Sequence, residues 1–271
     1  MRQKIKKEVA LVYLVAGISS RFGGKPKAFA KITENKRLIE YSLDQALKSN
    51  FSKIIFVVGE KTKKQFKKKF GSSYKGIPVF YALQKYNKKT RNKPWGTCDA
   101  LCAATPFLNC PFVVCNGDDI YGEHSFKILY NHLQKSKEEA TVSYRLINVL
   151  PEKGTVNRGI LKSEKGYVKE IKDSKNVLKA DLKATDNHPN DPCSTGIFAL
   201  HPESLKFLHA ELKKFKRQHR GNKDAEYGLP DQITKLIKTK KAKMKIYPAI
   251  GKWIGITNPG DEKTAREILE D

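Results

Sequence analysis

No stretch of this sequence approaches the ~20 uninterrupted apolar residues that a membrane-spanning helix needs. The N-terminus has a basic head and an apolar stretch, as a signal peptide has, but the stretch is short and runs directly into a loop of small residues. We interpret it as a first strand and expect a cytoplasmic protein. The chain also lacks an internal repeat and a clean linker, which predicts a single domain over residues 1–271.

The cysteines lack the spacing of a metal site. The 271 residues include five cysteines, without a C-x-x-C pair and without a histidine at metal-binding spacing. This pattern argues against a zinc site, and we expect the thiols to be small buried hydrophobes in a reducing compartment. The five are Cys98, Cys102, Cys110, Cys115 and Cys193.

Acidic residues are few relative to basic ones, and the formal net charge of +25 raises the possibility of a nucleic-acid partner. The lysines are scattered, however, and two lysine-rich runs carry apolar residues four apart, Phe66 with Phe70 and Leu208 with Leu212. Such lysines are typical of the solvated faces of helices. We therefore do not expect a nucleic-acid partner, although the charge would attract polyanionic small molecules such as NTPs.

The first half of the chain alternates short apolar runs with helical patterns. The predicted strands are residues 9–15, 53–58, 78–83 and 111–116, and the predicted helices are residues 38–48, 61–70 and 97–104. Parallel neighbours in a sheet need crossover helices, so this order predicts an α/β fold with a mostly parallel central sheet and helices on both faces.

The second half has strands at residues 141–147, 158–162 and 167–171 without long helices between them. A polar loop is predicted over residues 173–192, followed by a strand at 193–200 and helices at 201–215 and 229–237. Late strands at 243–250 and 252–256 precede a final helix that starts at Asn258 or Pro259. The C-terminal half is therefore more elaborate than the first.

The first predicted strand ends in the segment LVAGISSRFGGKPK. A loop after a parallel strand lies at the carboxyl edge of the sheet, where α/β proteins bind ligands. Its small residues allow close approach of backbone N–H groups to phosphate, Arg21 offers a bidentate fork and Lys27 a movable charge. The segment matches neither G-x-G-x-x-G nor G-x-x-x-x-G-K-[ST], so the residues alone also allow a plain solvent loop.

This segment resembles the signature of nucleotidyltransferases that make nucleotide sugars. Its Arg-to-Lys spacing is also similar to that of molybdenum-cofactor cytidylyltransferases, which share the fold. Further segments resemble the nucleotide-sugar family in the same order: KPWGTCDAL, VVCNGDDIYG, RGILKSEKGYVKEI, CSTGIFAL and WIGITNPGDEKTA. The resemblance implies a Rossmann-like nucleotidyltransferase (GT-A-like) fold. It also implies a nucleotide-binding half over residues 1–137 and a sugar-phosphate-binding half with a closing helix over residues 138–271.

The resemblance also implies a set of site residues. The catalytic residues would be Arg21, Lys27 and Asp118. The nucleotide would contact Ala16, Gly17, Ile18, Ser19, Ser20, Gln84, Gly96 and Thr97, and the sugar phosphate Gly159, Asp173, Thr195 and Gly196.

Gln84 and Gly96 would select the base. A side-chain amide presents both a donor and an acceptor, which suits uracil or thymine, and a glycine lets a base lie against the backbone. UTP or dTTP is therefore the expected substrate. An exposed loop glutamine is the competing interpretation of Gln84.

Asp118 follows a buried strand and is expected to bind Mg²⁺, with Mn²⁺ as a possible substitute, although Asn-Gly-Asp is also an ordinary turn. Two positions depart from the family: Ser174 stands where a Lys is usual, with Lys175 next, and Gly255 replaces a second metal-binding Asp. The ion would be held by Asp118, phosphates and water alone, or with help from Asp261 or Asp231.

The implied reaction joins an NTP to a sugar 1-phosphate and releases pyrophosphate. A phosphate monoester is already an anionic nucleophile, which agrees with motifs that lack a nucleophile–base pair. Two alternatives stay open: a glycosyltransferase of similar fold, for which the adjacent aspartates of NGDD are a poor match to Asp-x-Asp, and a non-catalytic nucleotide- or RNA-binding protein. The sequence also leaves open whether the chain forms a homo-oligomer.

Overall fold

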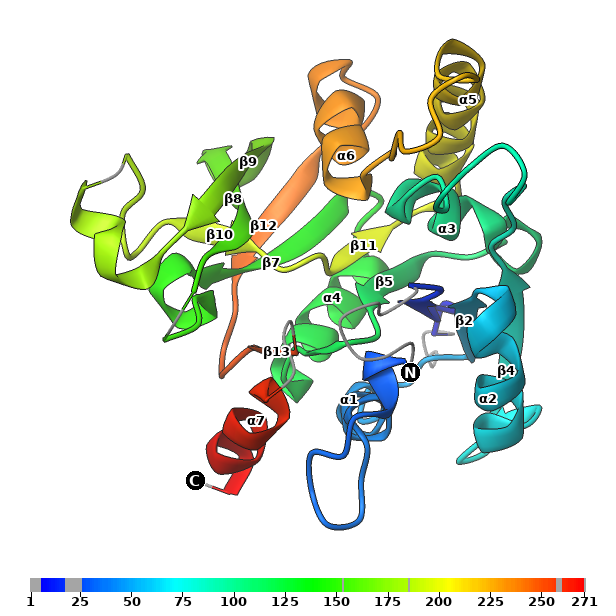
Figure 1. Ribbon diagram of the computed structural model, residues 1–271, viewed down its shortest axis with the longest axis horizontal. Coiled ribbons are helices and arrows are strands. Elements are labelled where there is room, and N and C mark those ends of the chain that lie inside the picture. Colours follow the sequence, from blue (N-terminus) through cyan, green and yellow to red (C-terminus); the bar gives the residue numbers. More distant parts are fainter. Residues whose placement is uncertain (1–5, 18–25, 153, 185, 257–259, 271) are drawn as a thin grey trace, which may run out of the picture.

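The computed structural model describes residues 6–17, 26–152, 154–184, 186–256 and 260–270. Within these residues, eleven strands form one sheet in the order β10-β8-β9-β12-β7-β11-β5-β1-β2-β4-β3 (Figure 1). Its strands are β1 Ala10–Val15, β2 Lys53–Val58, β3 Ser73–Tyr74, β4 Ile77–Leu83, β5 Phe112–Asn116, β7 Glu139–Arg145, β8 Val156–Glu164, β9 Tyr167–Val177, β10 Pro192–Ser194, β11 Phe198–Leu200 and β12 Met244–Pro248. A second sheet pairs β6 Asp119–Ile120 with β13 Ile254–Gly255.

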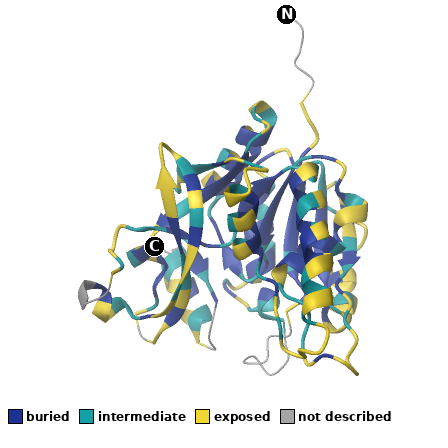
Figure 2. Cartoon of the chain, turned by 90° about the horizontal axis from the view of Figure 1, so that it is seen from above, coloured by how far each residue is buried: buried dark blue, intermediate teal, exposed yellow. Residues whose placement is uncertain are grey.

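The helices cover both faces of the sheet. They are α1 Leu38–Ala46, α2 Glu60–Phe70, α3 Thr97–Ala103, α4 Glu123–Lys135, α5 Pro202–Gln218, α6 Leu229–Lys238 and α7 Asp261–Glu270. Alternate side chains of β1 separate two cores: Leu11 and Tyr13 pack with α1, α2 and α4, whereas Ala10 and Val12 pack with α3, α5 and α6 (Figure 1). The central strands β1, β2 and β5 are therefore largely buried, whereas β8 and β9 at one side of the sheet carry many exposed residues (Figure 2).

The parallel part of the sheet is its N-terminal half. Strand β1 pairs in parallel with β2 and β5, and β2 pairs in parallel with β4, so the carboxyl ends of these four strands meet at one edge. The C-terminal half is mainly antiparallel, with the long β8–β9 hairpin and with β11 between β5 and β7. The pairing of β6 with β13 then returns the chain to the edge beside Asp119.

Most predicted elements are confirmed within two residues at their ends, but one helix was missed and two predictions are wrong. Helix α4 was not predicted, although its buried residues have helical spacing. The polar loop predicted over residues 173–192 instead contains the end of β9, which runs to Val177, and a 3₁₀ helix at Lys179–Ala184. The single strand predicted at 193–200 is interrupted between β10 and β11.

The cysteines and the lengths of the helices can be compared with the predictions. All five cysteines are buried and free, as expected for small hydrophobic side chains. In the part of the chain that the structure describes, every helix is too short or too polar to cross a membrane.

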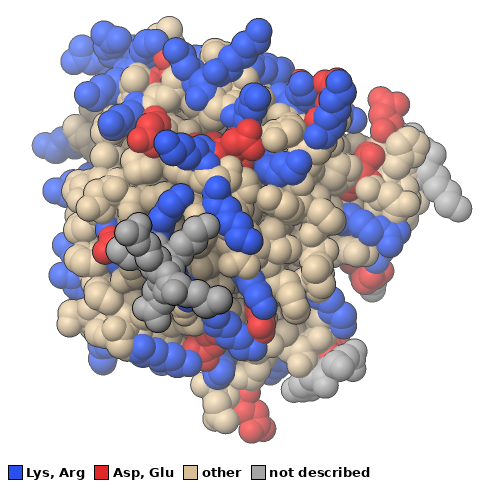
Figure 3. All heavy atoms as spheres, turned by 180° about the vertical axis from the view of Figure 1, so that it is seen from behind, with Lys and Arg blue, Asp and Glu red and all other residues tan. Residues whose placement is uncertain are grey.

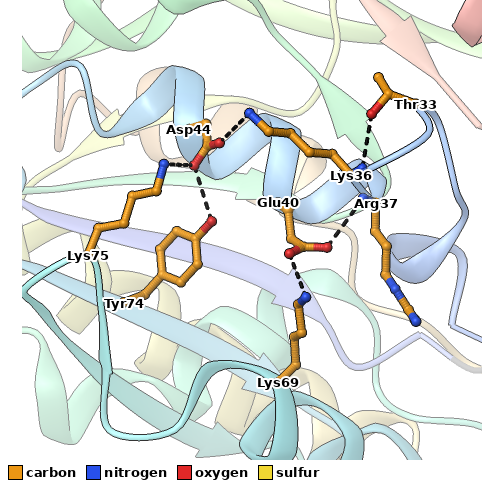
Figure 4. A network of polar contacts seen from close by, with 8 residues as sticks. All are labelled: Thr33, Lys36, Arg37, Glu40, Asp44, Lys69, Tyr74 and Lys75. Atoms are coloured by element: carbon orange, nitrogen blue, oxygen red, sulfur yellow. Dashed lines mark hydrogen bonds and ion pairs between the residues drawn. The ribbon is translucent and has the colours of Figure 1, made fainter.

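A polar network ties α1 to the β3–β4 hairpin (Figure 4). The Asp44 carboxylate accepts hydrogen bonds from Lys36 at 2.7 Å, Lys75 at 2.6 Å and the Tyr74 hydroxyl at 3.1 Å. Partial burial alone would raise the pKa of Asp44, but these hydrogen bonds outweigh it and hold the pKa below its ordinary value. The network therefore stabilises the fold most when Asp44 is ionised.

Candidate active site

The candidate site lies at the carboxyl edge of the four parallel strands. Ala16 and Gly17 follow β1, Gly59 follows β2 and Gln84 follows β4, and these four residues line one small hollow. Its other lining residues are Glu60, Lys61, Thr62, Tyr86, Lys88 and Pro94. The predicted site residues Ile18, Ser19, Ser20 and Arg21 lie outside the described residues.

Two residues of this edge were missed from the sequence. A Cβ on Gly59 would lie 2.9 Å from the Ala16 carbonyl oxygen, so only glycine allows β1 and β2 to end this close together. The Thr62 hydroxyl donates to the Val15 carbonyl at 3.1 Å and accepts from the Gly59 N–H at 3.0 Å. The rule that residues after parallel strands share one edge, which was applied to the loop after β1, also identifies Gly59.

Gln84 is buried, with only 6% of its surface exposed, so the interpretation as an exposed loop glutamine is wrong. Its side-chain Nε2 donates to the Gly96 carbonyl at 3.0 Å and to Asp99 Oδ2 at 2.7 Å. Both amide hydrogens are therefore used within the protein, and the oxygen is the part that can meet a ligand. The expectation that Gln84 offers a donor and an acceptor together is not met in this arrangement.

Gly96 is the N-cap of α3, at the helix N-terminus as expected. Its φ of +96° is unfavourable for other residues, and a Cβ there would lie 2.7 Å from the backbone N and O of Tyr227. The fold therefore requires glycine at this position on its own account, and contact of a base with Gly96 stays a prediction. Thr97 is similarly engaged, because its hydroxyl accepts a hydrogen bond from the Leu229 N–H at 2.9 Å.

The predicted catalytic residues Lys27 and Asp118 meet at this edge. Lys27 stands in a 3₁₀ helix at Lys27–Phe29, and Asp118 lies two residues beyond the end of β5. The Lys27 ammonium lies 3.7 Å from Asp118 Oδ2, and the two side chains are 18% and 39% exposed. A cation and a carboxylate that both remain accessible can act on one bound phosphate and its metal ion.

Asp119 is buried and organises the groups around it. Its carboxylate accepts hydrogen bonds from Asn116 Nδ2 at 3.1 Å and from the Tyr121 hydroxyl at 3.0 Å. Burial, and then the neighbouring charge of Asp118, raise the pKa of Asp119 to about 7. Asp119 therefore connects the end of β5 to Tyr121, whose hydroxyl also lies 3.3 Å from the Thr195 carbonyl.

The predicted sugar-phosphate residues fall into two groups. Thr195 and Gly196 stand beside Asn116, since a Cβ on Gly196, whose φ is +81°, would lie 2.8 Å from Asn116 Nδ2. The buried Thr195 hydroxyl oxygen makes no hydrogen bond with the described residues, as expected of a group that binds a ligand or water. Gly159 of β8 pairs with Ser194, the residue before Thr195, and on its other side with the exposed Asp173 of β9, so the second group lies directly beside the first.

The position of the missing second metal ligand is closed. A Cβ on Gly255 would collide with the Trp253 ring and lie 2.9 Å from Asp119 Oδ1, so this backbone leaves no room for another carboxylate. Asp231 stands in the first turn of α6, where burial, and then the charge of Asp173, raise its pKa.

Asp118 therefore remains the candidate metal-binding side chain. Asp261 lines, together with Gly255, a separate hollow beside β8. Among the described residues, no group of three or more His, Cys, Asp and Glu side chains could hold a metal ion. A single accessible carboxylate fits Mg²⁺, which is commonly bound by one or two carboxylates and completed by phosphates and water.

A strongly basic hollow adjoins Lys27. Its charged lining consists of Lys27, Lys31, Arg37, Lys68, Lys69, Glu262 and Arg266. Figure 3 shows the molecule from behind the view of Figure 1. On that face, Lys and Arg side chains are spread widely, with Asp and Glu side chains among them. The basic hollow is thus a local concentration of positive charge next to the candidate site, and would favour the approach of a polyanion.

Both a family profile and individual known proteins match most of this chain. The sequence profile of a family described as nucleotidyl transferase matches residues 22–253. The bifunctional protein GlmU of Bacillus subtilis is 24% identical over 227 residues, which are 82% of this chain and 43% of GlmU. A UTP–glucose-1-phosphate uridylyltransferase of Streptococcus pyogenes is 26% identical over 249 residues, with 83% of this chain and 77% of that protein covered. The chain thus spans less than half the length of the first relative.

The fold is also found among solved structures. A structure from Bacillus anthracis, described as a glucose-1-phosphate thymidylyltransferase, matches with a TM-score of 0.73 and 15% identity. The match covers 97% of this chain and 96% of the other. At this identity the likeness concerns the fold alone, and it confirms the predicted α/β fold with a parallel core.

Proposed function

Because the chain belongs to the nucleotidyl transferase family, we propose that it transfers the nucleotidyl group of UTP or dTTP to a sugar 1-phosphate and releases pyrophosphate. The observation that carries this proposal is the meeting of Lys27 and Asp118, 3.7 Å apart, at the strand edge that also forms the hollow beside Gln84. One end of the site suits a base and the other suits phosphates and their metal ion.

The proposed reaction needs positioning and charge, not a general base. An oxygen of the sugar phosphate attacks the α-phosphorus of the NTP in line with the departing pyrophosphate, and this nucleophile is already anionic. Lys27 would stabilise the negative charge that develops on the leaving pyrophosphate. Asp118 would hold Mg²⁺, which when bound supplies further neutralisation of the phosphates.

The sugar phosphate would lie on the other side of Asp118. The unpartnered Thr195 hydroxyl and the Gly196 backbone stand beside Asn116, which is held by Asp119, so this turn is rigidly placed next to the metal-binding carboxylate. Gly159 and Asp173 would extend the surface toward the sugar hydroxyls. Glucose 1-phosphate is the first sugar to test, because the uridylyltransferase relative is named for it.

A pyrophosphate-release assay tests the proposal. The chain is incubated with Mg²⁺, each of UTP, dTTP, CTP, ATP and GTP, and a panel of sugar 1-phosphates, and the sugar nucleotide is identified by mass spectrometry. Release of pyrophosphate that depends on both substrates supports the proposal. Transfer of sugar from a sugar nucleotide to an acceptor would favour the glycosyltransferase alternative, and nucleotide or RNA binding without turnover would favour the binding protein. The mass of the active species in solution would settle whether a single-domain monomer or a homo-oligomer is responsible.

A further inference from the structure

Asp99 is a buried carboxylate to which the reaction above gives no role. It stands in the first turn of α3, and its side chain is only 8% exposed. One carboxylate oxygen forms an ion pair with Lys216 of α5, and the other accepts a hydrogen bond from Gln84 Nε2 at 2.7 Å. Asp99 thus joins Lys216, from the C-terminal half of the chain, to Gln84, which lines the hollow at the strand edge.

The contact with Asp99 determines which way the Gln84 amide faces. An ionised carboxylate can only accept hydrogen bonds, so it must face the NH₂ group of the amide and never its oxygen. The Gly96 carbonyl, also an acceptor, takes the other hydrogen at 3.0 Å. Gln84 lines the hollow, and its oxygen has no hydrogen-bond partner among the described residues. The oxygen is therefore the polar atom of Gln84 that remains for a ligand in the hollow.

We infer that Asp99 is a positioning residue for base selection: it fixes the Gln84 amide with its oxygen available to the nucleotide. This inference rests on the proposed nucleotidyl transfer. An oxygen at this place accepts a hydrogen bond from the N3–H of uracil or thymine, whereas the corresponding ring nitrogen of cytosine is itself an acceptor and would repel it. The site therefore favours UTP or dTTP over CTP, and Asp99 enforces that preference without touching the base.

The isosteric substitution Asp99→Asn replaces the carboxylate oxygen that faces Gln84 by an NH₂ group, so a donor stands where the acceptor was. Lys216 would retain the Asn oxygen, which leaves the Asn NH₂ facing the NH₂ of Gln84. Rotation of the Gln84 amide would remove this clash between donors and turn an N–H toward the hollow, but it would also break the hydrogen bond to the Gly96 carbonyl. The variant therefore holds the amide in neither orientation as firmly as the wild type does. We expect the ratio of kcat/KM for UTP to kcat/KM for CTP to fall by about tenfold, because one hydrogen bond is exchanged for a repulsive contact.

The decisive control is the same change without Gln84. In a Gln84→Met background, Asp99→Asn should leave the UTP-to-CTP ratio unchanged, because Asp99 acts through the amide that is no longer there. If Asp99→Asn does not fold, as judged by circular dichroism, Lys216→Met takes its place, with Lys213→Met on the exposed face of α5 as the matched control. Lys216→Met should lower the ratio, since Asp99 loses the partner that holds it, and Lys213→Met should not.

An unchanged ratio in Asp99→Asn, or an equal change with and without Gln84, would overturn the inference and leave Asp99 a structural residue. Failure of the proposed function is a separate result, recognised when the wild-type chain releases no pyrophosphate with any NTP. In that case calorimetric binding of UMP and CMP replaces turnover as the measurement. A wild-type preference for UMP that Asp99→Asn reduces would still support the role of Asp99, and no preference would refute it.

Discussion

Replacement of Lys27 by alanine should lower kcat by about tenfold or more without unfolding the protein. The Lys27 side chain is 18% exposed and carries its ammonium to 3.7 Å from Asp118, so its removal leaves a small gap at the mouth of the site and no hole in either core. The effect should therefore appear in turnover and not in stability.

The magnitude follows from Coulomb's law for an ammonium group in contact with a phosphate. Two unit charges about 4 Å apart interact by about 4 kcal/mol at an effective dielectric constant of about 20. An NTP is a polyanion before it reacts, so most of the attraction to Lys27 acts equally on substrate and transition state and does not change kcat. If about a third of it arises only as charge moves to the departing pyrophosphate, the loss is about 1.4 kcal/mol, or about tenfold in rate.

The assay is continuous pyrophosphate release at saturating Mg²⁺, NTP and sugar 1-phosphate, with thermal unfolding measured on the same preparations. Lys31→Ala is the matched control, because Lys31 lines the same basic hollow but is exposed and forms no ion pair with Asp118 among the described residues. If Lys27→Ala and Lys31→Ala have the same kcat within about threefold, and both fold normally, the assignment of Lys27 to the transition state is wrong.

Three further predictions concern the metal, the strand edge and acid stability. Activity should require Mg²⁺ or Mn²⁺ and should not be supported by Zn²⁺ alone, because the candidate ligand is the single carboxylate of Asp118; full turnover after EDTA treatment would contradict this. Gly59→Ala should raise the KM for the NTP several-fold, because its Cβ would press on the Ala16 carbonyl at 2.9 Å and shift the β1 end; an unchanged KM would show that the hollow is not the nucleotide site. Asp44→Asn should lower the free energy of unfolding by about 1–2 kcal/mol at pH 7. Because the folded pKa of Asp44 lies below its ordinary value, the contribution is present above about pH 4 and fades as the pH falls further, so urea unfolding at pH 7 and near pH 3 should show a difference that shrinks on acidification.

The order of the elements and the edge that carries the site could be predicted from the sequence. The apolar runs at β1, β2, β4 and β5 are local signals, and the rule that ligands bind beyond the carboxyl ends of parallel strands then supports Asp118. Gln84 was named from the family resemblance. Helix α4 could also have been predicted, because Phe126, Leu129 and Leu133 have helical spacing. These inferences need only neighbours in sequence and the geometry of a strand.

Contacts between residues far apart in the sequence could not be predicted. The glycine at 96 is explained by the backbone of Tyr227. The position at Gly255 is closed by the nearby Trp253 ring and also by Asp119, which the pairing of β13 with β6 brings there. Each of these contacts depends on how separate loops pack, and no local pattern encodes such packing.

The sequence by itself determined the α/β class and the placing of Asp118 after a buried strand, because periodicity and strand ends are local properties of the chain. The candidate roles of Lys27 and Gln84 came from the motifs that the chain shares with its family. Only the tertiary structure decided that Lys27 meets Asp118, and which atom of Gln84 faces the hollow. The direction of an amide is set by the donors and acceptors around it, and here the acceptor Asp99 is held in place by Lys216 from a helix of the other half of the chain.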